Sequence, residues 1–168
     1  MIDSSLNRII IGGERMSAGF LVLPHVVFGV WGLFVTLWLI AEVVHISEKN
    51  LSRIKTASWV QAALIWLAFL FGGWWYYTYY NVEKEIILKG PFPQGQEFFM
   101  ETKEHVFFAL LLLSMFIPII VYQNNLLTNK SARRLVIVSA VMLIVLGFIM
   151  EGSGSLIAQA VKMGLGGK

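Results

Sequence analysis

The chain has 168 residues, of which 57% are hydrophobic and only 14% are charged, and its mean hydropathy is +0.72. This composition is typical of integral membrane proteins and excludes an ordinary soluble domain. The chain has no cysteine, which excludes disulfides, Cys-ligated iron–sulfur or zinc sites and covalently attached c-type haem. The net charge of +3 does not indicate nucleic acid as a partner, because basic residues in a membrane protein mostly record its topology.

Four apolar segments are long enough to cross the hydrocarbon core of a bilayer, which takes about 20 helical residues. We expect membrane spans at about 20–44, 57–80, 104–122 and 135–150. The last span can continue past its glycines to about Val161. Pro24 is expected in the first turns of span one, where proline is tolerated, and Pro118 is expected to kink span three. The sequence therefore predicts one all-α domain over 1–168, an up-down bundle of four transmembrane helices.

Basic residues predict the orientation of the bundle. The short connections after spans one and three carry Lys49, Arg53, Lys55, Lys130, Arg133 and Arg134. By the positive-inside rule these connections are cytoplasmic, so both termini and the connection 81–103 face outward. We therefore expect a multi-pass protein of the cell inner membrane with periplasmic termini. The segment Gly90–Gln96 contains two prolines and two glycines, so 81–103 is expected to be a turn-rich loop.

Two histidines are the strongest functional signal. His25 and His105 lie near the outward ends of spans one and three, at the same predicted depth. An ionisable side chain inside a span is costly, which favours a functional role. Two imidazoles facing each other across a bundle can hold the iron of one b-type haem between two axial nitrogens. Gly29 and Gly32 share the helix face of His25 and would leave a flat strip for the porphyrin, and Ala109 is small one turn after His105.

The same residues also have plainer interpretations. Small residues commonly mediate helix packing in membranes, and His105 could be a solvated residue at the interface. Glu151 could accept a proton from a quinol or be a helix-end carboxylate in water, and His45 could pair with Glu42 or contact a quinone headgroup. The haem propionates would pair with one of four basic residues, which are Arg15, Lys84, Lys89 and Lys103.

The placement of His25 and His105 on spans one and three, with the glycine strip below His25, resembles the small membrane b-type cytochromes. That resemblance implies a haem held between histidines of different helices, and electron exchange with quinones or periplasmic carriers. The segment 25–32 is also similar to the first helix of copper-resistance D-type membrane domains. The chain lacks a second histidine pair near the other face, so at most one conventional bis-His haem is expected.

We therefore expect a bilayer-embedded electron-transfer subunit that binds one haem b through His25 and His105, with a quinone or a periplasmic electron carrier as a further partner. At 18.9 kDa it would work with other membrane subunits or as a homodimer, and any catalytic chemistry would belong to a partner. One alternative is a cofactor-free accessory subunit of a larger membrane complex. Another is a copper-handling protein that uses both histidines with Met100 or a loop glutamate.

Overall fold

The computed structural model describes the backbone of residues 4–166 and the side chains of residues 20–166. Within that range the chain is almost entirely helical and contains no strand. The helices are α1 (Ser4–Val44), the 3-10 turn η1 (Glu48–Asn50), α2 (Leu51–Lys89), the π-helical η2 (Gly95–Met100), α3 (Glu101–Gln123) and α4 (Lys130–Gly164). The four α-helices carry segments long and apolar enough to cross a membrane. The predicted all-α, four-helix membrane fold is confirmed.

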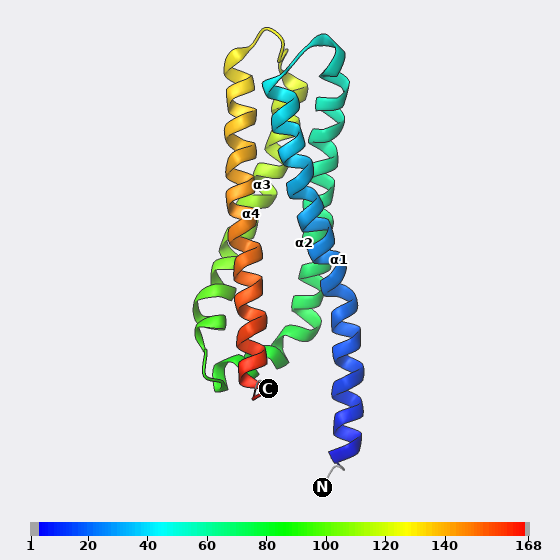
Figure 1. Ribbon diagram of the computed structural model, residues 1–168, viewed down its shortest axis with the longest axis vertical. Helices are drawn as coiled ribbons and strands as arrows, with labels where there is room; N and C mark the ends of the chain where they lie inside the picture. The colour runs from blue at the N-terminus through cyan, green and yellow to red at the C-terminus, as the bar shows by residue number, and fades with distance from the viewer. Residues whose placement is uncertain (1–3, 167–168) are drawn as a thin grey trace.

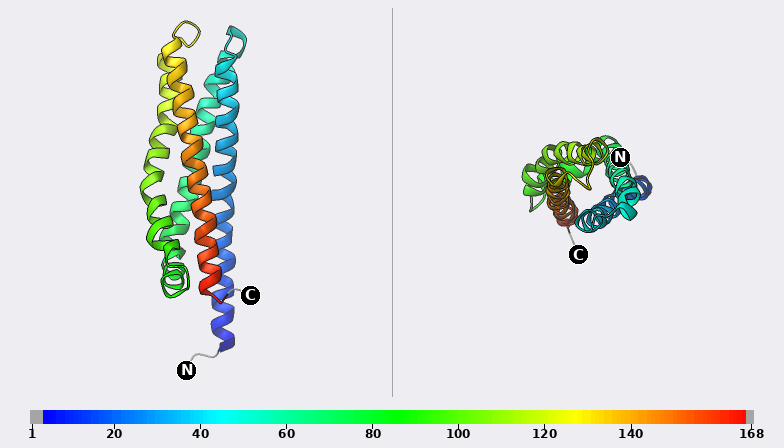
Figure 2. Two further views of the ribbon diagram at one scale, coloured as in Figure 1. Left: turned by 60° about the vertical axis from the view of Figure 1, so that its left-hand side comes forward. Right: turned by 90° about the horizontal axis from the view of Figure 1, so that it is seen from above.

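The four helices run up and down alongside one another (Figure 1). α1 packs against α2 and α4, and α3 packs against the same two helices. α1 and α3 therefore occupy opposite corners, as the view along the bundle shows (Figure 2). The α1–α2 and α3–α4 turns lie together at one end, which carries the six basic residues named above and is called the basic end. The first turn of α1 and the last turn of α4 point toward the other end, the terminal end.

The helices extend well beyond the predicted spans at the terminal end. α2 has 39 residues and α4 has 35, so at 1.5 Å per residue they are about 58 and 52 Å long, against about 30 Å of hydrocarbon. The expected loop 81–103 is wrong in extent, because α2 continues to Lys89 and helical structure resumes by Gly95. No glycine or proline precedes Gly90 in this stretch, so the helix has no reason to stop earlier. The predicted continuation of the last span past its glycines is confirmed.

The extensions pack into a small cap at the terminal end. Its buried cluster joins α2, η2 and α4 and consists of Tyr80, Ile87, Met100, Ile157 and Ala160. The Tyr80 hydroxyl donates a hydrogen bond to Oε1 of Gln96. Gly95 lies so close to Ala160 that a side chain at this position would collide with it. The proline- and glycine-rich turn therefore belongs to a packed cap.

A buried amide compensates for a proline in the middle of α3. Pro118 has no N–H, so the carbonyl of Ser114, four residues earlier, loses its helical hydrogen bond. Gln61 of α2 donates from Nε2 to that carbonyl over 2.7 Å, and Gln61 and Ser114 are both fully buried. Water is absent from the core of a bilayer, so a freed carbonyl must find its partner within the protein. This need explains why a glutamine is buried in an otherwise apolar interface.

Two further sequence expectations are resolved near α1. Pro24 lies in the interior of α1, because the helix begins at Ser4 rather than near residue 20. Glu42 does not pair with His45: it accepts hydrogen bonds from Arg53 Nε at 3.0 Å and from Asn50 Nδ2 at 2.8 Å. These bonds fix the turn between α1 and α2, while the ring of His45 is exposed and its Nδ1 bonds to the backbone carbonyl of Ala41.

We expect the Gln61→Leu variant to lose about 1–3 kcal/mol of stability, because it leaves the buried Ser114 carbonyl without a donor. The loss should be much smaller in a Pro118→Ala background, where residue 118 regains its N–H. The measurement is a double-mutant cycle of reversible unfolding in mixed micelles. An equal cost of Gln61→Leu in both backgrounds would show that the two residues are not coupled.

Candidate functional site

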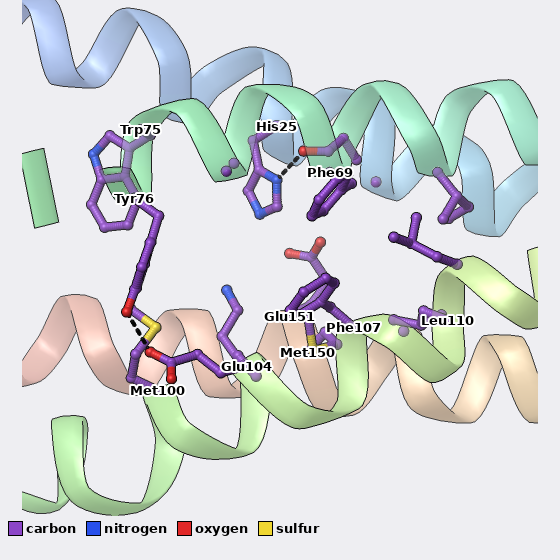
Figure 3. Close-up of a pocket in the computed structure, with 18 of the residues that line it drawn as sticks. His25, Phe69, Trp75, Tyr76, Met100, Glu104, Phe107, Leu110, Met150 and Glu151 are labelled. Atoms are coloured by element: carbon purple, nitrogen blue, oxygen red, sulfur yellow. Dashed lines mark hydrogen bonds between the residues drawn. The ribbon is translucent and has the colours of Figure 1, made fainter. Parts of the chain in front are cut away.

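A cavity of about 310 Å³ lies between the four helices, in the half of the bundle toward the terminal end. Figure 3 shows that residues from all four helices surround it. Its walls are mostly apolar and aromatic, with contributions from Leu33, Ile65, Phe69, Trp75, Phe107 and Met150. A concave apolar site with a few polar groups is the usual form of a small-molecule binding site.

His25 of α1 points into this cavity in one defined orientation (Figure 3). Its Nδ1 lies 2.7 Å from the carbonyl oxygen of Ala68 in α2. A carbonyl can only accept, so Nδ1 carries the hydrogen and the neutral ring keeps a lone pair on Nε2. The ring lies directly against Gly72, where a Cβ would come within 2.5 Å of Nδ1. Gly72 therefore provides the space in which this histidine can reach the Ala68 carbonyl.

Two charged residues share the cavity with His25. The Glu151 carboxylate of α4 lies against Gly29 of α1, where a Cβ would be 3.0 Å from its Oε1. The ammonium group of Lys103 lies against Gly154, where a Cβ would be 3.2 Å from Nζ. Lys103, Glu151 and His25 all line the same cavity. The cavity therefore brings together a base, a cation and a carboxylate from three different helices.

A second carboxylate at the cavity wall is already engaged. Glu104 of α3 accepts a hydrogen bond of 2.6 Å from the hydroxyl of Tyr76 in α2. Tyr76 stacks on Tyr80, whose ring centroid is 5.0 Å away and which belongs to the cap. This contact fastens α3 to α2 beside the cavity. Glu104 and Tyr76 therefore link α3 to α2 at the cavity wall.

The cavity lies about one bilayer core away from the basic end. Nineteen residues separate His25 from the end of α1 at Val44, and 20 separate Lys103 from the end of α3 at Gln123. At 1.5 Å per residue these distances are about 29 and 30 Å, close to the thickness of the hydrocarbon. The exposed side chains of Trp74 and Tyr77 lie at the corresponding level of α2, as expected of an aromatic belt. The polar groups are thus near the membrane boundary.

The structure does not bring His105 to His25. His105 is exposed, its Nδ1 donates to the backbone carbonyl of Glu101 over 2.6 Å, and it lines a separate shallow groove with Glu97 and Phe98. The expectation that the two imidazoles face each other is therefore not met by their positions. The face of α3 that carries His105 and Ala109, which we expected to face the haem, is instead exposed and also includes Phe108, Leu112 and Phe116.

The other predicted site residues are distributed between the cavity and the helix interfaces. Gly29 lines the cavity, whereas Gly32 allows α1 and α2 to approach, since a Cβ there would be 2.8 Å from Cδ1 of Ile65. Ala109 is exposed and does not line the cavity. Met100, considered as a copper ligand, is buried at the border between the cavity and the cap.

Of the four basic residues considered as propionate partners, Lys103 lines the cavity. Lys84 is exposed on the cap, and Lys89 pairs with Glu85 at 3.0 Å. The side chain of Arg15 lies outside the described residues. The orientation of α3 is the reason why Lys103, two residues before His105, is the cationic residue that faces the cavity.

A signal for the inner face of α3 exists in the sequence. Ser114 is a polar residue in the middle of an apolar span, and polar residues in such spans usually face other helices. Steps of three or four residues back from Ser114 reach Leu110, Phe107 and Lys103, all of which line the cavity. The same steps taken from His105 instead of Ser114 select the opposite face of α3.

Comparison with protein-family models, curated proteins and solved structures finds no match to this chain. Within the described residues, no group of three or more His, Cys, Asp or Glu side chains is arranged to hold a metal ion.

The Gly72→Ala variant should displace the His25 ring and break its hydrogen bond to the Ala68 carbonyl, because the new Cβ would occupy the position of the ring. Gly73→Ala is a matched control, since the nearest atom to its Cβ would be Phe69 Cε2 at 4.0 Å. Side-chain ¹⁵N NMR of the three histidines should show an Nδ1–H tautomer for His25 in wild type and Gly73→Ala only. The same His25 signals in all three proteins would contradict this role of Gly72.

Proposed function

We propose that this protein is a membrane electron-transfer subunit that binds one b-type haem in the cavity, with His25 as an axial ligand. The observation that carries the proposal is the orientation of His25, with Nδ1 bonded to a backbone carbonyl and Nε2 free toward the cavity. Metal-bound histidines are typically held in this way, because the second hydrogen bond fixes both the tautomer and the ring plane. The haem, when bound, would supply one-electron chemistry at its iron.

The walls of the cavity support an apolar, non-covalent cofactor. Phe69 and Phe107 stack with their ring centroids 5.2 Å apart at one side, and the small residues Gly29, Gly72 and Gly147 also line the cavity. The chain's role would be to bind the ring, orient His25 toward the iron and keep water away. His105 has no part in this version of the site, because it lines a different surface.

The cellular setting is part of the proposal. The six basic residues at the basic end support a cytoplasmic position for that end. The cavity would then lie near the periplasmic face of the inner membrane, and both termini would be periplasmic. Electrons would be exchanged with a quinone or a periplasmic carrier, within a complex with other membrane subunits or a second copy.

The haem assignment is tested by spectroscopy of the purified protein. We expect a Soret band and a sharp alpha band on reduction, loss of both in His25→Ala, and retention in His105→Ala and His45→Ala. The three histidine variants should remain folded by circular dichroism and gel filtration. A folded wild-type protein that takes up no haem, or a His25→Ala variant with an unchanged spectrum, would contradict the proposal.

The orientation is tested separately with single cysteines, since the natural chain has none. Gln94 in the cap and Ser131 near the basic end are both exposed. In intact cells with a permeabilised outer membrane, a membrane-impermeant maleimide should label Gln94→Cys and leave Ser131→Cys unlabelled. The reverse pattern would place the cavity near the cytoplasmic face.

A quinone in the cavity is a second candidate, favoured by the Glu151 carboxylate. Within the described residues Glu151 has no hydrogen-bond partner, and together with Nε2 of His25 it offers two acceptors to the hydroxyls of a quinol. A colourless protein that binds a short-chain quinol, with affinity at least tenfold lower in Glu151→Gln, would favour this candidate over haem. A colourless protein that binds neither would favour an accessory subunit.

A further inference from the structure

We infer that Lys103 supplies the second axial ligand, so that the site is a His25–Lys103 pair rather than a pair of histidines. This inference rests on the proposed haem function and specifies its ligand set. The cavity is lined by one histidine, His25, and by one amine, that of Lys103. Lys103 belongs to α3, the helix on which the second histidine ligand was expected.

The arrangement of the helices places Lys103 across the cavity from His25. α1 and α3 occupy opposite corners of the bundle, so residues on their inner faces point toward each other. His25 is at the level of Gly72 in α2, and the hydrogen bond between Tyr76 and Glu104 ties the first turn of α3 to the next turn of α2. Lys103 is thus within about one helical turn of the level of His25, and both residues line the same cavity.

The amine of Lys103 is not committed to another polar group. Among the described residues it forms neither a hydrogen bond nor an ion pair within 4 Å, although Glu151 is close enough for an electrostatic interaction. A lysine inside a membrane span normally has a partner or faces a functional cavity. Lys103 faces the cavity, and its long, flexible side chain can reach into it.

Coordination by Lys103 would require the loss of one proton and no oxidant or reductant. An ammonium group has no lone pair, so Lys103 must lose one proton before its nitrogen can bond to iron. The proton would go to water at the nearby membrane boundary, and the neutral amine of Lys103 would then be free to hold the iron. Apolar surroundings favour the neutral form of an amine, which lowers the cost of this step.

Two methionines and one carboxylate are the competing ligands. Met100, Met150 and Glu151 also line the cavity. Met100 belongs to the buried cluster of the cap, and Met150 packs against the main hydrophobic core. Both methionines therefore already have a packing role, which leaves Glu151 as the competing ligand that the spectrum must distinguish from Lys103.

The test uses the full-length, haem-loaded ferric protein and near-infrared magnetic circular dichroism, which distinguishes amine, sulfur and carboxylate ligands opposite histidine. We expect a low-spin amine signature in wild type and in His105→Ala. Lys103→Ala and Lys103→Arg should become high-spin while retaining haem within twofold of the wild-type stoichiometry. The arginine variant keeps the charge but cannot coordinate, which separates ligation from electrostatics. Added n-butylamine should restore the low-spin signature in Lys103→Ala only.

A second readout follows the lysine itself. With haem bound, labelling of Lys103 by an amine-reactive ester should fall at least tenfold, while the exposed Lys89 and Lys162 should keep their labelling, as quantified by mass spectrometry. A low-spin Lys103→Ala protein, a sulfur or carboxylate signature in wild type, or unprotected Lys103 would overturn the inference and leave haem binding through His25 intact. A protein that takes up no haem would overturn the proposed function and this inference together.

Discussion

The hydrogen bond between Nδ1 of His25 and the carbonyl of Ala68 determines what the cavity can do. It joins α1 to α2, fixes the tautomer of the imidazole and leaves the lone pair of Nε2 directed toward the cavity. The bond requires glycine at position 72, since any Cβ at Gly72 would occupy the position of the ring. A neutral imidazole held in this way has little freedom to turn toward lipid or toward the backbone, so its chemistry is available to whatever enters the cavity.

The rest of the bundle supports this arrangement. The core toward the basic end is closely packed, and there Nε2 of Gln61 donates to the Ser114 carbonyl that Pro118 leaves without a helical donor. At the terminal end the cap fastens α2, η2 and α4 together, and the Tyr76–Glu104 bond holds α3 against α2. The cavity lies between these two packed regions. It is therefore bordered on both sides by rigid structure, at a depth where a lipid-soluble ligand and the aqueous phase are both near.

The sequence predicts the fold well because length and hydropathy are sufficient to identify membrane spans. The four spans, the continuation of the last helix and the clustering of basic residues require no knowledge of contacts. The loop 81–103 was predicted too long because the turn chemistry around Gly90 was extended to neighbours that are good helix formers. Hydropathy alone also cannot locate the end of a helix that leaves the membrane without unfolding.

The site is predicted only in part, and the reason is the rotation of one helix. His105 and Lys103 are two residues apart, which is about 200° around an α-helix, so only one of them can face the cavity. α3 is apolar on all sides, and its periodicity therefore does not distinguish a face that packs from a face that contacts lipid. The packing of Ser114 against α2 makes that choice, and it is a tertiary contact.

Under the proposed function, one histidine, and only one, would bond to the haem iron. Pulsed electron paramagnetic resonance on the ferric, haem-loaded protein with ¹⁵N-labelled histidine measures this directly, through the hyperfine coupling of directly bonded nitrogens. The structure leads us to expect one strongly coupled histidine nitrogen, which disappears in His25→Ala. Two coupled histidine nitrogens, or none, would contradict the account.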